Sequence, residues 1–266
     1  ADEAYFKTAG TKGVYPLMYY NHNIHFLSYA MSMAGNYAKA KESADQIAQN
    51  AAPYVKEMPM VEGFVPTPIF IVLRFRKWDE ILKISDPGAG LPVTRVAWRL
   101  ARGIAFARTN RLQEAEKERI AFQEAKKSIP DDFAFGMLNT AGGIFRLVEP
   151  LLNAEIAMAK KDFTEAVAEF AKAVAAEDSL NYDEPPAWFQ PVRESLGAAL
   201  LRSGNAVEAE KVFRQDFEKN PRNGRSLFGL MESLKAQGKS SDARSVELQW
   251  KAAWQSADTG LRLEDL

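Results

Sequence analysis

The feature that most constrains the fold of this chain is a six-residue cluster that recurs along it. A copy typically begins with Gly or Asn, has an aromatic or apolar residue at its third position and ends with Ala. The interval from Gly204 to Gly238 is 34 residues, as is that from Trp78 to Leu112. A fixed period of this length predicts an array of stacked structural repeats. The copies are Gly35–Ala40, Asn110–Ala115, Lys161–Ala166, Gly204–Ala209 and Gly238–Ala243, with a degenerate copy at Arg76–Ile81.

The chemistry of the cluster predicts two helices joined by a tight turn. Gly or Asn can end the first helix because these residues tolerate the left-handed backbone conformation. The apolar third residue packs between the two helices, and the small Ala lets their backbones approach closely. Each repeat is therefore expected to be an antiparallel helix pair.

Hydrophobic periodicity extends this expectation to an all-α chain, because no segment shows the alternation of a strand. Pro66 and Pro68 predict that the third helix is short or irregular, and Gly142-Gly143 with Pro150 predict that the seventh is broken. We expect a connector at 1–19, the helical array at 20–258 and a tail at 259–266. The predicted helices are 20–34, 38–51, 63–74, 77–84, 92–108, 112–127, 134–159, 164–176, 187–203, 206–219, 224–236 and 240–256.

The repeat at 190–223 is similar to the tetratricopeptide-repeat family. The resemblance rests on Leu196-Gly197, Leu200, Gly204, Ala209, Phe213 and Pro221. It implies a right-handed superhelix of about six antiparallel helix pairs.

Two further segments, 13–27 and 182–194, resemble the C-terminal half of a group of larger bacterial proteins with these repeats. This resemblance implies the fold and an N-terminal half upstream, but no activity. Members of the group tend to have a His near the segment Trp98–Gly103, where this sequence has Arg99. A shared His-based metal site is therefore not implied.

Charge and composition exclude several classes of partner. Lys and Arg total 34 against 35 Asp and Glu, so no basic field attracts nucleic acid or an anionic membrane. No apolar stretch is long enough to predict a membrane span. The absence of Cys removes disulfides, thiolate nucleophiles and Cys metal ligands, and it favours an exported, periplasmic protein without its signal over a cytoplasmic one.

The two histidines, His22 and His25, are three residues apart and share one face of a helix. Two imidazoles could contribute to a Zn or Fe site. The spacing of a His-Glu-x-x-His motif is missing, and no third ligand is adjacent. We therefore expect both histidines to have a structural role, with metal binding as the alternative.

The polar insertion 178–186 is longer than a helix-pair linker needs, and long loops on rigid scaffolds often carry function. Tyr182, Glu184 and Trp188 are the candidate ligand-binding residues here. The favoured interpretation is structural: Pro185-Pro186 begins a helix, Asp183 or Glu184 lies at its positive end, and Tyr182 and Trp188 pack beneath the loop.

A stripe of Arg95, Arg99 and Arg102 lies along one side of a predicted helix, beside Trp98. Such a stripe could bind a carboxylate or phosphate on the concave surface, and Arg74 and Arg76 could extend it. A solvated face that pairs with neighbouring acidic residues is the favoured interpretation.

No catalytic constellation is present, because the sequence has no nucleophile elbow and no phosphate-binding Gly loop. We therefore expect a non-enzymatic binding or scaffold protein that needs no cofactor and holds a protein or peptide on its concave face. The alternative is a small-molecule or metal site formed by Tyr20, His22, His25 and the 182–188 loop. A third possibility is one half of a larger solenoid that forms a homodimer through an exposed end.

Overall fold

The computed structural model describes residues 16–266, so most of the predicted connector 1–19 lies outside the described residues. Nearly all of the regular structure is helical, which confirms the all-α prediction. The elements are η1 (Pro16–Tyr20), α2 (Asn21–Met33), α3 (Tyr37–Ala51), η2 (Ala52–Tyr54), η3 (Pro59–Phe64), α4 (Thr67–Arg74), α5 (Trp78–Lys83), α6 (Pro92–Arg108), α7 (Leu112–Lys126), β1 (Ala134–Phe135), β2 (Asn139–Thr140), α8 (Ala141–Ala159), α9 (Phe163–Asp178), α10 (Val192–Arg202), α11 (Ala206–Lys219), α12 (Gly224–Ala236), α13 (Ser240–Ala253) and η4 (Leu263–Asp265).

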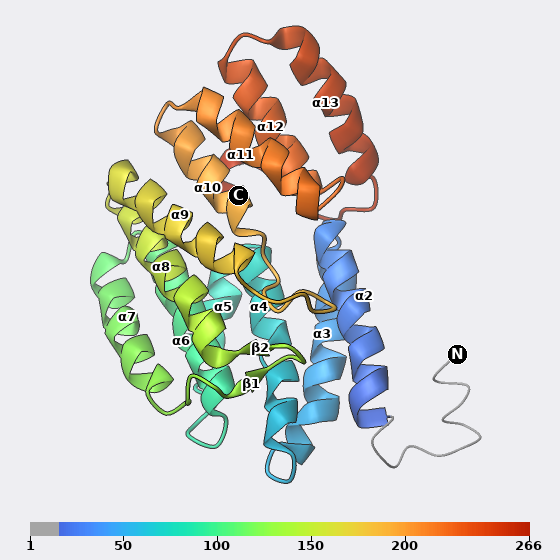
Figure 1. Cartoon of the computed structure of the whole chain (residues 1–266), viewed down its shortest axis with the longest axis vertical. Helices are drawn as coiled ribbons and strands as arrows, with labels where there is room; N and C mark the ends of the chain where they lie inside the picture. Colours follow the sequence, from blue (N-terminus) through green and yellow to red (C-terminus); the bar gives the residue numbers. More distant parts are fainter. Residues whose placement is uncertain (1–15) are drawn as a thin grey trace, which may run out of the picture.

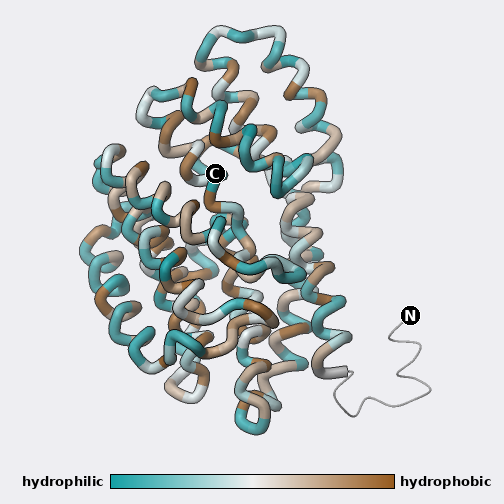
Figure 2. Tube along the Cα trace, viewed as in Figure 1, coloured by the Kyte–Doolittle hydropathy of each residue, from teal (hydrophilic) through white to brown (hydrophobic). Residues whose placement is uncertain are grey.

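Consecutive helices pack against each other as pairs, and each pair packs against the next (Figure 1). The long pairs are α2 with α3, α6 with α7, α8 with α9, α10 with α11, and α12 with α13, while α4 and α5 are short. Each helix contains both polar and apolar residues along its length (Figure 2), as expected where one face of a helix is buried and the other faces solvent.

The turns between paired helices have the predicted left-handed residue. In this part of the chain φ lies between 56° and 86° at Gly35, Arg76, Asn110, Lys161, Gly204 and Gly238, which are the first residues of the six clusters. The sixth residue of each cluster is buried, with Ala40, Ala115, Ala166, Ala209 and Ile81 at 0% exposure and Ala243 at 3%. Local steric rules therefore account for the turns at Gly35, Asn110, Gly204 and Gly238, whereas Arg76 and Lys161 adopt the left-handed conformation against their intrinsic preference.

Two predicted helices differ from those in the structure. The segment 134–159 begins with the β1–β2 hairpin, and α8 then runs without a break to Ala159 and includes Pro150. The glycines begin the helix and do not break it, since the Thr140 hydroxyl accepts from Gly143 N at 3.3 Å as an N-cap.

The second difference is at the start of α10, which begins at Val192 and not at 187. Pro185-Pro186 is therefore not a helix start, and neither Asp183 nor Glu184 caps one. The carboxylate of Glu177 has that role, because it accepts from Val192 N at 3.1 Å. Burial raises the pKa of Glu177 to about 8, against the effect of this hydrogen bond.

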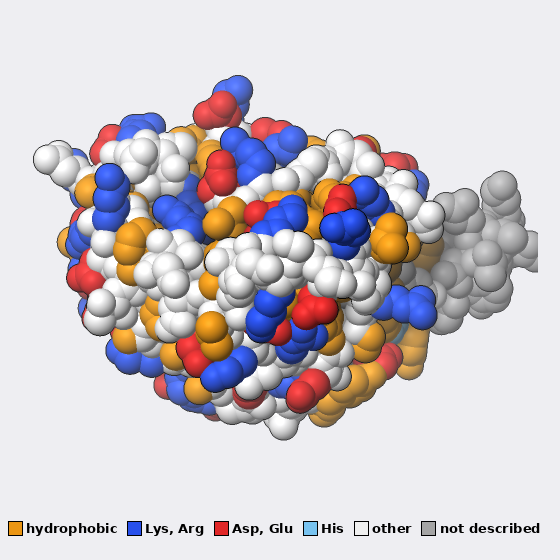
Figure 3. Space-filling view, turned by 90° about the horizontal axis from the view of Figure 1, so that it is seen from above, with side chains coloured by type: hydrophobic (Ala, Val, Ile, Leu, Met, Phe, Trp, Pro, Cys, Tyr) orange, Lys and Arg blue, Asp and Glu red, His pale blue; other side chains and the backbone are white. Residues whose placement is uncertain are grey.

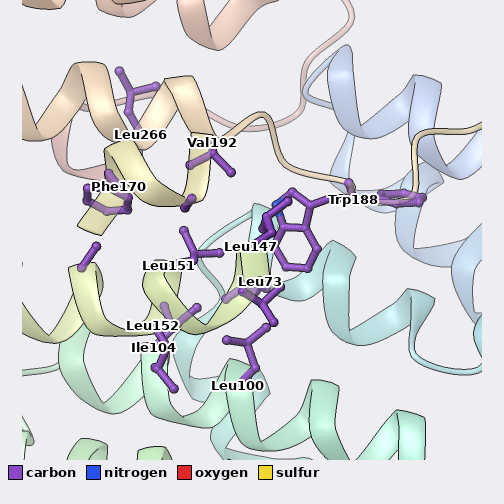
Figure 4. Packing of buried hydrophobic residues seen from close by; sticks show 14 of the residues in the cluster. Leu73, Leu100, Ile104, Leu147, Leu151, Leu152, Phe170, Trp188, Val192 and Leu266 are labelled. Carbon is purple, nitrogen blue, oxygen red and sulfur yellow. The ribbon is translucent and has the colours of Figure 1, made fainter. Parts of the chain in front are cut away.

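One continuous hydrophobic core runs through the helix pairs (Figure 4). Side chains from α4, α6, α8 and α9 meet in it, including Leu73, Leu100, Leu147 and Phe170. Because the core is continuous, the pairs are not independent units.

The last helix pair is fastened to the first turn. After α13, a closing loop (residues 254–258) contacts the turn between α2 and α3 (Figure 1). The Asp258 carboxylate accepts from Tyr37 N at 2.7 Å and from Ala38 N at 2.9 Å, and so caps α3. The Trp254 ring lies where a Cβ at Gly35 or Gly224 would clash with it.

The surface shows no field of a single sign on the face seen in Figure 3, where Lys and Arg are interspersed with Asp and Glu. Across residues 16–266, none of the helices combines the length and apolar character needed to cross a bilayer.

Candidate functional site

The interior of the helical array contains a group of arginines that we call the arginine cluster, namely Arg74, Arg76, Arg108 and Arg225. Arg74 and Arg108 end α4 and α6, Arg76 lies in the α4–α5 turn, and Arg225 lies in the first turn of α12. The exposed fractions of these side chains are between 1% and 12%. Guanidinium groups so far from water require acceptors on the protein.

Glu194 of α10 is the first acceptor. Its carboxylate lies 3.2 Å from Arg74 Nη2 and 2.6 Å from Arg225 Nε, and it is 3% exposed. Asn223 Nδ2 donates to it at 2.8 Å and also to Asp216 at 2.7 Å. The amide thus links two buried acids that would otherwise repel each other.

Glu155 of α8 is the second acceptor. It accepts from Arg108 Nη2 at 2.8 Å, and Arg76 Nη1 lies 3.5 Å from it. Arg108 Nε also pairs with its other oxygen. Glu155 lies in the stretch Ala154–Met158 of α8, in which every residue is buried.

The electrostatics of the arginine cluster keep its acids ionised. Burial opposes ionisation, but the charges of Arg108 and Arg76 hold the pKa of Glu155 below its usual value. Burial is likewise outweighed at Glu194, whose pKa is lowered by Arg74 and Arg225. Burial lowers the pKa of Arg76 to about 9, so this guanidinium is still charged at neutral pH.

The main chain of residues 259–266, which we call the tail segment, supplies the remaining hydrogen-bond acceptors of the arginine cluster. Arg76 donates to the main-chain oxygens of Asp265 at 3.2 Å and Leu266 at 2.6 Å. Arg108 Nη1 donates to the oxygen of Glu264 at 3.4 Å, and Arg225 Nη2 also donates to the oxygen of Asp265. The end of the chain lies at the centre of the array (Figure 1).

Apolar side chains anchor the tail segment, since Leu261 and Leu263 pack, partly buried, against the main core. Leu266 is 0% exposed and belongs to the main core, on the side of Val192 and Phe170 (Figure 4). Arg262 and Glu264 have side chains that are 72% and 58% exposed. The segment forms the 3₁₀ turn η4 at Leu263–Asp265 and is held by its backbone oxygens and by its leucines, of which Leu266 is fully buried.

The predicted stripe of Arg95, Arg99 and Arg102 lies elsewhere and is paired with acids. Arg99 Nη1 lies 2.9 Å from Glu118, Arg102 Nε lies 2.8 Å from the same carboxylate, and Arg95 Nη2 lies 2.9 Å from Asp86. Arg99 and Arg102 also lie over the Trp98 ring, at 4.3 and 4.9 Å. The paired-face interpretation is confirmed by these contacts, and Arg74 and Arg76 do not extend the stripe.

The two histidines have aromatic neighbours. His25 stacks on Phe189 with centroids 5.0 Å apart, and His22 meets Phe26 edge to face. Burial, with a smaller effect of His22, lowers the pKa of His25 to about 3, so its ring is neutral. Tyr20 lies at the start of the same region, where its hydroxyl accepts from Gln46 at 3.1 Å.

The loop residues are separated in the structure. Tyr182 is 73% exposed, and Glu184 is also exposed, whereas Trp188 is 4% exposed and packs against Phe70. Tyr182 was expected to pack beneath the loop, but Asn181 and Asp183 hold the loop to the β1–β2 hairpin and leave its ring in solvent. Trp188 is packed as expected.

Trp188 also lines a small apolar pocket with Phe70 and Phe145. The pocket volume of about 30 Å³ has room for about two water-sized molecules. It is thus too small for a metabolite. In the part of the chain that is described, no group of three His, Asp or Glu side chains is arranged to hold a metal ion.

The arginine cluster was only partly visible in the sequence. The sequence predicted that Arg74 and Arg76 could extend the stripe of Arg95, Arg99 and Arg102, and they lie in the arginine cluster instead. The sequence did not predict a role for Arg108, Arg225, Glu155 or Glu194. Glu155 carries a usable signal, since an acid among the apolar residues Ala154, Ile156, Ala157 and Met158 predicts a buried partner.

The contacts of the arginine cluster support binding of oxygen-bearing groups, and none of its residues is placed as a nucleophile beside a base. In comparisons with models of known protein families, with curated proteins and with solved structures, no match to this chain was found.

Proposed function

We propose that this protein is a non-enzymatic binding or scaffold protein, built from tetratricopeptide-type helix pairs, that holds a protein segment at the arginine cluster. The observation that carries the proposal is the tail segment itself. Its last three main-chain oxygens accept from Arg76, Arg108 and Arg225, and the Leu266 side chain fills an apolar site beside them.

The chemistry of these contacts suits a peptide better than a small polar ligand. Main-chain oxygens at successive residues are available at the end of any helical turn such as η4, and the Arg76 guanidinium donates to two of them at once. One buried aliphatic side chain then supplies apolar burial of roughly 1.5–3 kcal/mol. Backbone contacts give affinity, and the apolar site gives specificity.

Selection from a random peptide library against the immobilised full chain tests this function. We expect enriched peptides that bind the folded protein and cross-link to residues near Arg76 and Arg225. An Arg99→Gln variant is the matched control, since Arg99 pairs on another surface, and it should bind the same peptides equally well. Failure to enrich any peptide that cross-links near the arginine cluster would refute the proposal.

A further inference from the structure

Two neighbouring loops present apolar side chains to solvent at one place on the surface. Met137 and Leu138, at the tip of the β1–β2 hairpin, are 83% and 58% exposed, and Tyr182 of the α9–α10 loop is 73% exposed. The hairpin and this loop lie side by side (Figure 1) and are joined by hydrogen bonds. We call these three side chains the hairpin patch. Apolar side chains that are scattered singly over a surface are normal, whereas a group held together is typical of an interaction surface.

A hydrogen-bond network between the two loops holds the hairpin patch in place. The Asp183 carboxylate accepts from Met137 N at 3.1 Å, and Asn181 Nδ2 donates to Leu138 O at 2.7 Å. Asn181 N donates to Asn139 Oδ1 at 2.9 Å, and Asn139 Nδ2 donates back to Asn181 O at 3.0 Å. These bonds fix the backbone on both sides of the exposed tyrosine. A surface that is already ordered loses little conformational entropy when a partner binds.

The core of the protein does not depend on the hairpin patch. Phe133 and Phe135 anchor the hairpin, because both are half-buried and pack against the main core. Phe135 also lines the small apolar pocket beside Trp188. Met137 and Leu138 lie beyond these anchors and are mostly in solvent. Substitutions in the patch are therefore expected to leave the fold intact.

Acidic residues outnumber basic ones beside the hairpin patch. The segments 131–146 and 179–190 contain Asp131, Asp132, Asp183 and Glu184 but a single cation, Arg146. Across residues 16–266, the ion pairs of the flanking helices α8, α9 and α10 are formed by other acids. The charges of the whole chain nearly balance, so this excess of negative charge is local. A local excess of one sign attracts a partner of the opposite sign.

We propose that the hairpin patch is a docking surface for a basic segment of a partner protein, in which aliphatic residues are flanked by Arg or Lys. The aliphatic side chains of the segment cover Met137 and Leu138, and its basic side chains face Asp132 and Glu184. A guanidinium of the segment stacks on the ring of Tyr182, as cations do on aromatic faces. Met and aromatic residues are enriched at protein interfaces, which fits the composition of the patch. This surface is separate from the arginine cluster, and the inference does not rest on the proposed function.

The charge beside the hairpin patch disfavours other occupants. The phosphates of a nucleic acid and the headgroups of an anionic membrane would be repelled by the same acids. Two copies of this chain that met through their hairpin patches would bring like charges together. A basic protein segment gains from both the apolar side chains and the acids.

The test uses the full chain and a short fluorescent peptide in which two Leu are flanked on each side by two Arg, read by fluorescence anisotropy. Met137→Ser combined with Tyr182→Ser removes most of the apolar surface of the patch. We expect this double variant to bind the peptide at least about tenfold more weakly than the unmodified chain. Leu248→Ser is the control, because Leu248 is 68% exposed on α13, and it should bind like the unmodified chain.

A second pair of variants tests the contribution of charge. Asp132→Asn combined with Glu184→Gln removes two acids beside the patch and should weaken binding by about threefold or more at low ionic strength. Glu42→Gln combined with Glu208→Gln removes the same charge from α3 and α11 and should weaken binding less. Binding should also weaken as the ionic strength rises from about 0.01 M to about 0.15 M, because salt screens exposed charges. If circular dichroism shows that the Ser double variant is unfolded, the charge variants give the deciding comparison.

The inference is overturned if the unmodified chain does not bind the Arg-flanked peptide at about 1 mM, or if a folded Met137→Ser, Tyr182→Ser chain binds it equally well. It is also overturned if a peptide with Glu in place of Arg binds as tightly, or if the two charge variants bind alike. Vesicles of phosphatidylcholine and phosphatidylserine test the other occupant. If the unmodified chain binds these vesicles and the Ser double variant does not, the hairpin patch contacts membranes and is not a docking surface for a basic protein segment.

Discussion

Arg76 donates from Nη2 to the main-chain oxygen of Leu266 at 2.6 Å, although the two residues are 190 positions apart in the chain. Arg76 also occupies a left-handed turn position, where φ is 56° and Gly is the usual residue. Arg76 therefore adopts a strained backbone conformation and joins the α4–α5 turn to the tail segment. This contact connects the turn of one repeat with the arginine cluster.

The burial of Leu266 predicts that this residue contributes to stability. Leu266→Ala should lower the free energy of unfolding by about 2–5 kcal/mol, because it leaves a cavity in the main core. Leu248→Ala removes the same atoms from a side chain that is 68% exposed, and its effect should stay within about 0.5 kcal/mol. Urea unfolding of both variants makes the comparison. Equal effects would show that Leu266 is not packed in solution.

Glu194 pairs with two buried arginines, so we expect its removal to lower the stability of the protein strongly. Glu194→Ala leaves Arg74 and Arg225 buried without their carboxylate, and we expect a loss of about 3–5 kcal/mol in the free energy of unfolding. Glu42→Ala breaks an exposed pair with Lys39 and should cost less than about 1 kcal/mol. Both values come from denaturant titrations at one ionic strength. A loss below 1 kcal/mol for Glu194→Ala would mean that water reaches the arginine cluster.

The contact of α10 with α11 predicts the effect of a single added methyl group. A Cβ at Gly197 would lie 2.5 Å from Cζ of Phe213, which is 0% exposed, so the ring cannot move aside freely. Gly197→Ala should therefore destabilise the protein by about 1–3 kcal/mol. The matched control is Gly63→Ala, where no atom lies within 4 Å of the added Cβ. Thermal unfolding measures the difference, and equal melting temperatures would contradict this packing.

The low pKa of His25 predicts how stability changes with pH. In the unfolded chain the imidazole takes up a proton near pH 6.5, while in the folded protein burial lowers its pKa to about 3. Protonation therefore favours the unfolded state, and its contribution to stability falls as the pH decreases from about 6.5 towards 3. His25→Phe keeps a ring against Phe189 and removes the proton site, so the decrease should be smaller.

The measurement is the free energy of unfolding of both proteins at pH 7.5 and pH 5. Both chains have the same carboxylates. The difference between their changes in the free energy of unfolding with pH therefore reports the protonation of His25. If the free energy of unfolding decreases equally in both proteins between pH 7.5 and pH 5, protonation of His25 does not destabilise the fold.

The sequence predicted the parts of the fold that depend on local rules. The turns that begin with Gly or Asn follow from residues within one cluster, as Gly35 and Ala40 illustrate, because sterics favour the left-handed conformation there. The paired surface of Arg99 was predicted for a similar reason, because Glu118 lies on the next helix.

The arginine cluster was not predictable by the same reasoning. Arg76 and Arg225 meet the tail segment through main-chain oxygens, and such contacts leave no pattern of residue types. The start of α10 was misplaced because Glu177, fifteen residues before Val192 in the chain, supplies the cap that Pro185-Pro186 was expected to supply. Long-range partners of this kind are set by the assembled fold.

The junction of the closing loop with the first turn also affects how the molecule carries load. In an open array each repeat contacts only its neighbours, so terminal repeats can unravel alone. Here the hydrogen bonds of Asp258 to Tyr37 and Ala38 tie the two ends of the array together. A pulling force applied between α2 and α13 would act on this junction first, and the helix pairs between them would bear tension only after it had parted.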